Sequence, residues 1–333
     1  MNPMSMSGTF PTVAVTGSTG FVGRHVVREL VARGHPVRAL ARGRDRVAEA
    51  FGLLDGGKVE YVFGDVFDAA AMRDLMHGAS AVVHAIGIRR EFPPEVTFER
   101  MHPRATEAAV RAAEHARARR FIHISAMGTR PGAPSAYHRS KHESEAIVRE
   151  SGLEWTILRP SIIHGPDGEF MKMAKSWAMG RSAPFFFMPY FTRMEKPQGF
   201  GPPKFVSAKV QPVSVGDVAF AAVEAIHREE AVGEIYPLGG PDVIDWPTML
   251  ATVRDAIPLA DHHKKIRGIP GDAARVKAVI ASKIGLAAAL PFGPSEPVMA
   301  MEDNVCSNEK ARADLGFEPS DFVTSVKSYG ERI

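Results

Sequence analysis

A tyrosine and a lysine stand four residues apart in the middle of the chain, at Tyr137 and Lys141. In a helix, residues at i and i+4 project from the same face, so these two side chains are expected to lie close together. An ammonium group beside a phenol stabilises the phenolate and lowers its pKa. The pair is therefore suited to proton transfer near neutral pH, and Lys141 can also hold the hydroxyls of a ribose. The same spacing occurs by chance on surface helices, so its meaning depends on the surrounding elements.

A second chemical feature lies near the N-terminus, where glycines stand at positions 17, 20 and 23. An apolar run precedes them and an amphipathic run follows, which is the order of strand, glycine turn and helix that binds a dinucleotide pyrophosphate. Gly17 is predicted to make the sharp turn, Gly20 to admit the phosphate and Gly23 to let the helix pack closely. The helix N-terminus then presents free N–H groups to the anion. The predicted cradle also includes Thr19, Phe21 and Val22. The alternative is an ordinary strand-to-helix turn.

Two arginines, Arg42 and Arg44, follow the second predicted strand at 36–41. In a dinucleotide-binding fold an acidic residue here holds the ribose 2′-hydroxyl, whereas an arginine accommodates a 2′-phosphate. No Asp or Glu occurs between Val37 and Arg44. The sequence therefore favours NADP(H) over NAD(H), with Arg42 as the first candidate and Arg44 as the second. The alternative is that both arginines belong to a solvated loop.

These residues need a scaffold, and the apolar pattern supplies one. Six short apolar runs alternate with helical stretches between residues 13 and 158. The pattern predicts an α/β fold with a doubly wound parallel sheet of the Rossmann type, and a smaller C-terminal α+β region. We expect a dinucleotide-binding domain at 10–165, to which 205–238 returns. A substrate or partner region is expected at 166–204 and 239–333.

Further cofactor contacts are predicted where the strands end, because ligands of such sheets bind at the carboxyl ends of the strands. Asp65 can bond the adenine amino group or cap the helix that begins near Ala69. The small-residue turn at 85–87 leaves room for a ribose. The remaining candidates in these positions are Val66, Ala85, Ile86, Gly87, Pro160, Ile162 and Ile163.

Together these features resemble the short-chain dehydrogenase/reductase superfamily in its extended or atypical branch, which includes NAD-dependent epimerases and dehydratases. The resemblance rests on residues 16–23, 64–65, Tyr137 with Lys141, 158–165 and 210–219. It is closest to the group of the short-chain-dehydrogenase-like accessory subunit of respiratory complex I. Residues 140–145, 158–161, 210–213, 238–241 and 303–305 carry that narrower resemblance.

One position departs from the superfamily pattern. Its enzymes usually place a Ser or Thr just past the fifth strand, where the hydroxyl binds the substrate carbonyl. Here Ser125 stands one position early and Ala126 occupies the expected place. Either Ser125 is catalytic with a one-residue offset, or this donor is missing. Loss of one such donor typically lowers the rate by about 10²–10³-fold.

Composition excludes several function classes. With 41 basic and 38 acidic residues the net charge is only +3, and no basic stripe indicates a nucleic-acid partner. The single Cys306 excludes an internal disulfide, and no spacing predicts a metal site. No signal peptide and no apolar run of about 18 residues is found. The expected location is cytoplasmic, and a peripheral position at a membrane is the alternative that stays open.

Two segments can contact something other than the cofactor. Residues 184–191 are rich in aromatic side chains, which can line an apolar pocket, dock on a membrane or protein complex, or form a buried crossover. Residues 273–290 are apolar and rich in alanine with basic side chains between them, which suits a membrane interface or packing within the second region.

Two functions of different classes follow. The first is an NADP(H)-dependent oxidoreductase that acts on a small apolar carbonyl or quinone-like substrate, with Tyr137 and Lys141 as catalytic residues. Epimerase or dehydratase chemistry that uses the cofactor transiently is a variant of it. The second is a non-catalytic NADP(H)-binding accessory subunit or redox sensor of a respiratory or membrane-associated complex. Ala126 and the complex I resemblance favour the second function, whereas the retained Tyr137 and Lys141 favour the enzyme.

Overall fold

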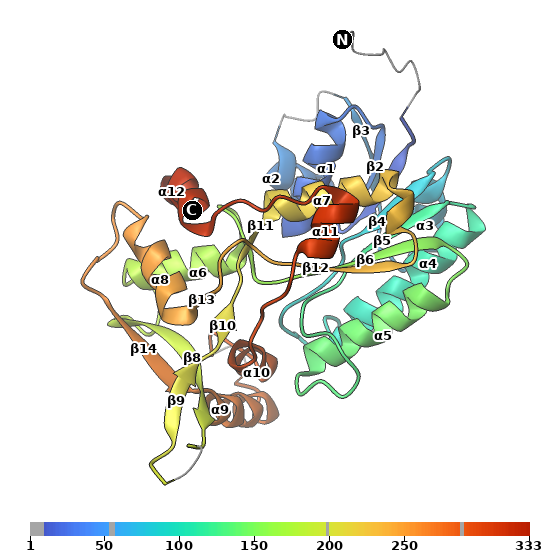
Figure 1. Cartoon of the computed structure of the whole chain (residues 1–333). Coiled ribbons are helices and arrows are strands. Elements are labelled where there is room, and N and C mark those ends of the chain that lie inside the picture. Colours follow the sequence, from blue (N-terminus) through green and yellow to red (C-terminus); the bar gives the residue numbers. More distant parts are fainter. Residues whose placement is uncertain (1–9, 53–56, 198–199, 287–289) are drawn as a thin grey trace.

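A seven-stranded parallel sheet forms the centre of the larger region of the molecule (Figure 1). The computed structural model describes residues 10–52, 57–197, 200–286 and 290–333. The strand order is β12-β6-β5-β4-β1-β2-β3, and all six neighbouring pairs are parallel. The order reverses between β1 and β4, which is the switch point where doubly wound folds bind ligands. The predicted Rossmann fold is confirmed.

The elements of this region follow the predicted alternation. Its strands are β1 (Val13–Thr16), β2 (Val37–Ala41), β3 (Val59–Phe63), β4 (Ala81–His84), β5 (Arg120–Ile124), β6 (Glu154–Pro160) and β12 (Glu234–Leu238). Its helices are α1 (Phe21–Ala32), α2 (Arg44–Phe51), α3 (Ala69–Met76), α4 (Ala105–His115), α5 (Ala136–Glu150), α7 (Val215–His227) and α11 (Glu309–Leu315).

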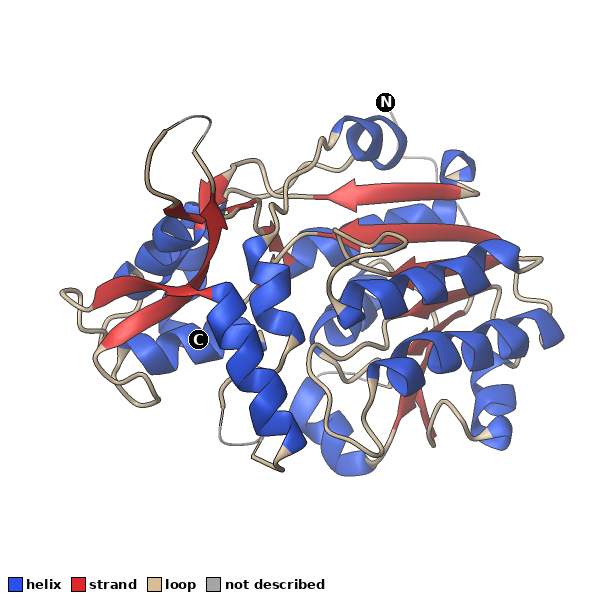
Figure 2. Cartoon of the chain, turned by 90° about the horizontal axis from the view of Figure 1, so that it is seen from below, coloured by secondary structure: helices blue, strands red, loops and turns tan. Residues whose placement is uncertain are grey.

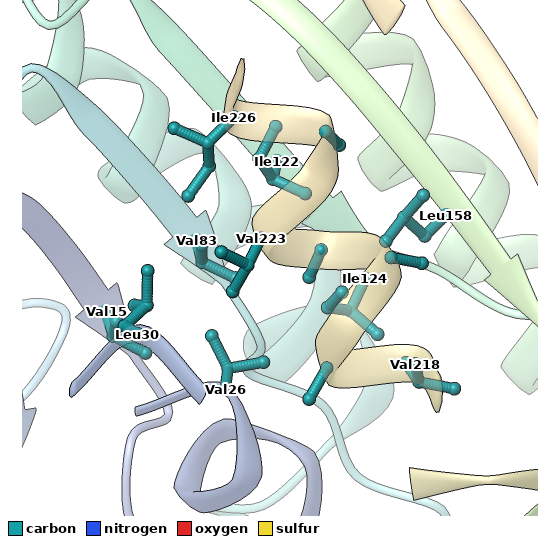
Figure 3. Close-up of a cluster of buried hydrophobic side chains, with 14 of the residues drawn as sticks. Val15, Val26, Leu30, Val83, Ile122, Ile124, Leu158, Val218, Val223 and Ile226 are labelled. Carbon is teal, nitrogen blue, oxygen red and sulfur yellow. The ribbon is translucent and has the colours of Figure 1, made fainter. Parts of the chain in front are cut away.

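Helices cover both faces of the sheet, which explains why β1, β4 and β5 are buried along their whole length (Figure 2). On one face, α1, α7 and α11 enclose a core that includes Leu30, Ile122 and Val223. Figure 3 shows α7 lying across the strands, with Val223 and Ile226 beside Val83 and Ile122. On the other face, α3, α4 and α5 pack over Val82 and Phe121. Residues 215–227, far from β1 in sequence, thus complete the same core.

The second region is smaller and has its own core. A three-stranded sheet of β14 (Lys265–Pro270), β8 (Phe187–Glu195) and β9 (Lys204–Ser207) packs with α9 (Gly271–Lys283) and α10 (Ser295–Met301). Helices α6 (Glu169–Ala178), α8 (Trp246–Asp255) and α12 (Phe322–Tyr329) surround a core that includes Met171, Leu250 and Val326. None of the described helices is both long and apolar enough to cross a membrane.

Short pairs of strands join the two regions. β7 (Ile163–His164) pairs with β11 (Val213–Ser214), and β10 (Lys209–Val210) pairs with β13 (Ile244–Asp245). At the same junction the Gln211 amide donates to the carbonyl of Gly240, and the Asn308 amide donates to the carbonyl of Gly239. The segments 210–213 and 238–241, which carried part of the complex I resemblance, therefore interlock with each other.

Candidate functional site

The glycine loop between β1 and α1 is held by backbone contacts that exclude side chains. Gly17 has a φ of +69°, and a Cβ there would lie 2.8 Å from the carbonyl of Ala85. A Cβ on Gly23 would lie 2.1 Å from the Gly17 oxygen. Gly20 precedes α1 as its N-cap, and no side chain caps this helix. The uncapped first turn, which lacks acidic residues, fits a bound pyrophosphate.

A line of close contacts leads from this loop to the tyrosine–lysine pair. Gly17 touches Ala85 and Ile86 at the carboxyl end of β4, and a Cβ on Gly87 would lie 3.1 Å from the Lys141 Nζ atom. Lys141 stands on α5, one turn after Tyr137, as the spacing predicted. The structure therefore places the glycine loop, the 85–87 turn and Lys141 next to one another at the switch point of the sheet.

Tyr137 lies among aromatic rings rather than against the lysine ammonium. The rings of Phe98, His102 and His138 meet its ring edge-to-face, with centroids 5.8, 5.4 and 5.3 Å away. Burial raises the pKa of Tyr137 to about 12, although Arg89 opposes the shift. The lowered pKa expected from Lys141 is therefore wrong for this structure, because desolvation of the phenol outweighs the one opposing charge, that of Arg89.

Lys141 is almost fully buried, and its Nζ atom donates to the carbonyl oxygen of Ile124 at 2.9 Å. Burial lowers its pKa to about 8, and the nearby Glu145 carboxylate opposes the shift. The side chain thus keeps a positive charge at neutral pH. Among the described residues its one hydrogen-bond acceptor is the Ile124 carbonyl at the end of β5, and an ammonium group has three N–H donors, so others can serve a ribose.

Ser125 directs its hydroxyl to a buried ion pair. Its Oγ atom donates to Glu145 Oε1 at 2.5 Å, and Arg159 binds the same carboxylate through two nitrogens at 2.8 and 2.5 Å. Glu145 is completely buried. Because the Ser125 proton is already donated, this structure offers no support for Ser125 as the donor to a substrate carbonyl.

The end of β2 presents the two arginines differently. Arg42 is exposed, and among the described residues it makes no ion pair. Arg44 opens α2 and lies over the ring of Phe63, with its guanidinium 5.5 Å from the ring centroid. Arg42 is thus the arginine that is free to meet a phosphate.

Asp65 does not cap α3. Its Oδ1 atom accepts from the N–H of Phe67, whereas Asp68 accepts from the N–H groups of Ala70 and Ala71 and is the N-cap. The capping alternative for Asp65 is therefore wrong, because Asp68 directly precedes the helix. Asp65 itself is exposed beside the buried Val66.

The remaining predicted cofactor residues border the same edge of the sheet. Pro160 ends β6, while Ile162 and Ile163 lead into the β7–β11 pair and are partly exposed. Thr19 and Val22 are partly exposed in the glycine loop and the first turn of α1. Phe21 turns back onto the segment after β7, where its ring lies 3.0 Å from a Cβ built on Gly168.

His102, beside the pair, is a site residue that we did not predict from the sequence. It lies in a π-helix (Arg100–Arg104) that directly precedes α4. Pro103 within it lacks an N–H and cannot continue the α-helical bonding, which explains the widened turn. His102 is hydrogen-bonded through Nδ1 to Ser140 and through Nε2 to Ile88. A proline inside a helical pattern was the available signal.

Two arginines connect this site to the second region. Arg89, in the loop after β4, binds Glu296 at 3.0 Å and Glu169 at 3.3 Å. Arg130 binds Glu302 at 2.6 Å. Glutamates from α6 and from the 296–302 segment thus reach the loops that flank Tyr137. Among the described residues, no group of three or more His, Cys, Asp or Glu side chains is arranged to hold a metal ion.

Comparison with known families and proteins agrees with this geometry. The sequence family described as NAD(P)H-binding matches residues 17–175, from the glycine loop to α6. A reductase of a (4-alkanoyl-5-oxo-2,5-dihydrofuran-3-yl)methyl phosphate from Streptomyces griseus is 32% identical over 70% of this chain and 69% of its own length.

Two further relatives are similar over parts of the chain. A mitochondrial NADH dehydrogenase [ubiquinone] 1 alpha subcomplex subunit 9 from Arabidopsis thaliana is 31% identical over 76% of this chain and 59% of its own length. A ceramide reductase from Caulobacter vibrioides is 38% identical over 46% of this chain and 47% of its own length. The chain thus spans about half to three fifths of these two relatives.

Solved structures share the whole architecture. An epimerase from Methanothermobacter thermautotrophicus superimposes with a TM-score of 0.71, at 17% identity, over 96% of this chain and 91% of its own. At that identity the likeness concerns the fold, including the second region.

Proposed function

This chain belongs to the extended short-chain dehydrogenase/reductase superfamily and contains an NAD(P)H-binding domain, and from that premise we propose that it is an NADP(H)-dependent oxidoreductase. The observation that carries the proposal is the line of contacts from Gly17 through the 85–87 turn to Lys141, one helical turn from Tyr137. The glycine loop, in which a Cβ would collide with backbone, fits a pyrophosphate. The exposed Arg42 fits a 2′-phosphate.

The chemistry follows from the two side chains. When bound, the nicotinamide supplies or accepts a hydride. Tyr137 is the proposed proton donor to a substrate oxygen; burial, which raises its pKa to about 12, keeps the hydroxyl protonated but also makes it a weaker acid. Lys141 carries the charge that holds the ribose hydroxyls.

The proposed substrate is an apolar carbonyl or quinone-like compound. The rings of Phe98, His102 and His138 that pack around the Tyr137 ring support a substrate with a flat or apolar group. Two relatives are named as reductases, one of ceramide and one of an alkanoyl-bearing phosphate. These names support the class of reaction and an acyl-bearing substrate.

The test is the Tyr137→Phe variant, measured by NADPH oxidation with a panel of quinones and long-chain carbonyl compounds. Turnover is expected to fall by about 10²–10⁴-fold while NADPH affinity changes little, because only the proton donor is removed. Ser125→Ala is the matched variant, and it is expected to lower stability more than turnover. A rate unaffected by Tyr137→Phe would refute the proton-donor role. Substrate conversion without net NADPH oxidation would indicate epimerase or dehydratase chemistry instead.

The second candidate is a non-catalytic accessory subunit or redox sensor that keeps NADP(H) as a structural ligand. The specific observation in its favour is the missing donor: Ala126 has no hydroxyl, and Ser125 has given its proton to Glu145. Tight NADPH binding by the wild type, with no oxidation by any compound of the panel, would support this candidate and overturn the enzyme.

A further inference from the structure

Helix α9 turns an apolar stripe outward. Val276, Ile280 and Ile284 are spaced four residues apart on and just past the helix, and 57, 54 and 62% of their surfaces are exposed. The opposite face of the helix is buried through Ala274 and Ala278. A surface helix normally hides such a stripe against the core. Here the small alanines pack inward and the large aliphatic side chains point to solvent.

Basic side chains surround the stripe. Between residues 265 and 286 the chain carries five basic residues and one acidic residue, Asp272. The basic residues are Lys265, Arg267, Arg275, Lys277 and Lys283. Within the part of the chain that the structure describes, none of the five forms an ion pair. Elsewhere on this molecule arginines are paired with glutamates, as at Arg89 and Arg130. The cations beside the stripe are thus available to an anionic partner.

The β8–β9 hairpin extends the same surface. Its side chains Met194 and Phe205 are 51 and 59% exposed, and Phe200 near its tip is fully exposed. Lys196 and Lys204 stand at the base of the tip. Helix α9 packs against β8, and both elements lie at the lower end of Figure 1. The hairpin residues Met194 and Phe205, which pair with each other, thus add exposed apolar side chains to the sheet on which α9 packs.

We propose that this face, formed by α9 and the β8–β9 hairpin, binds the surface of an anionic lipid bilayer. A helix with large aliphatic residues on one side and basic residues at its edges lies in the plane of the headgroups, where the aliphatic groups enter the acyl boundary and the cations meet lipid phosphates. Lysine is depleted at protein–protein interfaces, so the four lysines on the helix and the hairpin favour lipid over a protein partner.

Both 273–290 and 184–191 were candidates for a membrane contact. The structure favours the first segment. In the second segment Phe191 packs against Phe292, at 5.1 Å between ring centroids, and Phe187 lies under Arg267. The strand residues 187–191 are therefore used within the sheet, whereas Phe185 and Phe186, which precede β8, are exposed. Of the 273–290 segment, residues 287–289 lie outside the described part of the chain. Vesicle binding by this face does not require turnover, so a negative result for the reductase would not contradict it.

The test is flotation of the full chain with vesicles of phosphatidylcholine alone or mixed with phosphatidylglycerol. Binding is expected only to the anionic vesicles and is expected to weaken with added salt. Lys277→Gln with Lys283→Gln is expected to weaken binding by about fivefold for each charge removed. Ile280→Gln with Ile284→Gln is expected to weaken it by about tenfold or more. The matched control is Leu259→Gln. Leu259 is also an exposed aliphatic residue, at 77%, but it lies away from α9, beside Gly330 and Glu331.

Three outcomes would overturn the proposal. They are the absence of flotation with either vesicle, flotation that the α9 variants leave unchanged, and a dimer that dissociates on Ile280→Gln with Ile284→Gln in analytical ultracentrifugation. The last result would assign the face to a second copy of the chain. NADPH binding by every variant serves as the measure of folding.

Discussion

The two regions of this protein fix the positions of their candidate functional residues by different kinds of contact. In the sheet region, backbone atoms fix the site: Gly17 meets Ala85, Gly23 meets Gly17, and Lys141 donates to the carbonyl of Ile124. In the second region, side chains make the connections, through pairs such as Arg89 with Glu296 and Arg193 with Asp303. Backbone contacts tolerate almost no substitution, whereas exposed ion pairs contribute little each.

The contrast separates two tasks. A dinucleotide has a fixed shape, so the loop that holds it can be rigid and can be built from glycines. The proposed substrate and lipid contacts of the second region are less restricted in shape, and that region offers long side chains around a short sheet. The same contrast orders the expected effects of substitution, from the sheet region to its periphery.

The largest effect is expected for Gly23→Ala. The new Cβ would lie 2.1 Å from a backbone oxygen that cannot move without opening the Gly17 turn. We expect a loss of more than about 4 kcal/mol of unfolding free energy, with no NADPH binding. The measurement is urea denaturation followed by circular dichroism.

Gly216→Ala is the matched control, because Gly216 also lies in the first turn of a helix and a Cβ there meets nothing closer than 3.5 Å. That variant is expected to be as stable as the wild type, or more stable by about 0.5–1 kcal/mol, since alanine favours a helix over glycine. Equal losses in both variants would contradict the role assigned to the backbone contact.

A smaller effect is expected when a buried and an exposed ion pair are broken. Arg159→Met leaves the fully buried Glu145 with the Ser125 hydroxyl and with Arg149, whose nitrogen is 3.6 Å away, and about 3 kcal/mol of stability should be lost. Arg130→Met removes the partner of Glu302, whose pair is far more exposed, and less than about 1 kcal/mol should be lost. Both are measured by urea denaturation. Similar losses would show that the two regions are held equally firmly.

The parts of the site that the sequence predicted are those set by local pattern. Gly17, Gly20 and Gly23 follow from the chain passing between a strand and a helix, and Tyr137 with Lys141 follows from helical spacing. The strand alternation was sufficient for the parallel sheet, which the structure and the solved epimerase confirm. The resemblance to the complex I subunit group is likewise confirmed by a relative with that name.

The parts that escaped prediction depend on contacts between distant residues. His102 reaches Tyr137 because Pro103 widens a helix, and Ser125 is withdrawn by a glutamate twenty residues later in the chain. The direction of the Tyr137 pKa shift depends on how deeply the ring is buried, and the four-residue spacing from Lys141 does not give that depth. The N-cap of α3 is Asp68 and not Asp65, because Asp68 is the aspartate that directly precedes the helix.

The third prediction concerns acid. Burial lowers the pKa of His164, at the junction of the regions beside Tyr329, to about 4. Because an unfolded histidine titrates near 6.5, the stability that neutral His164 contributes is present above pH 6.5 and is lost as the pH falls toward 4. About 2 kcal/mol should disappear between pH 6.5 and 5 from this group alone. His164→Gln should lack that share of the loss in urea titrations at each pH, whereas the exposed His115→Gln should match the wild type.

The smallest expected effect concerns the cofactor's 2′-phosphate and distinguishes two neighbouring arginines. Arg42 is exposed without an ion pair among the described residues, while Arg44 already lies over Phe63. Arg42→Ala is expected to weaken NADPH binding by about tenfold, since a charge-assisted bond to phosphate is lost, and to leave NADH binding within about twofold. Arg44→Ala is expected to change NADPH binding by less than about threefold. Fluorescence titration of the reduced nucleotides measures both. A greater loss of NADPH affinity at Arg44 would reverse the assignment of the phosphate-binding arginine. Equal affinity of the wild type for NADH and NADPH would contradict both assignments, because the exposed end of β2 would then recognise no phosphate at all.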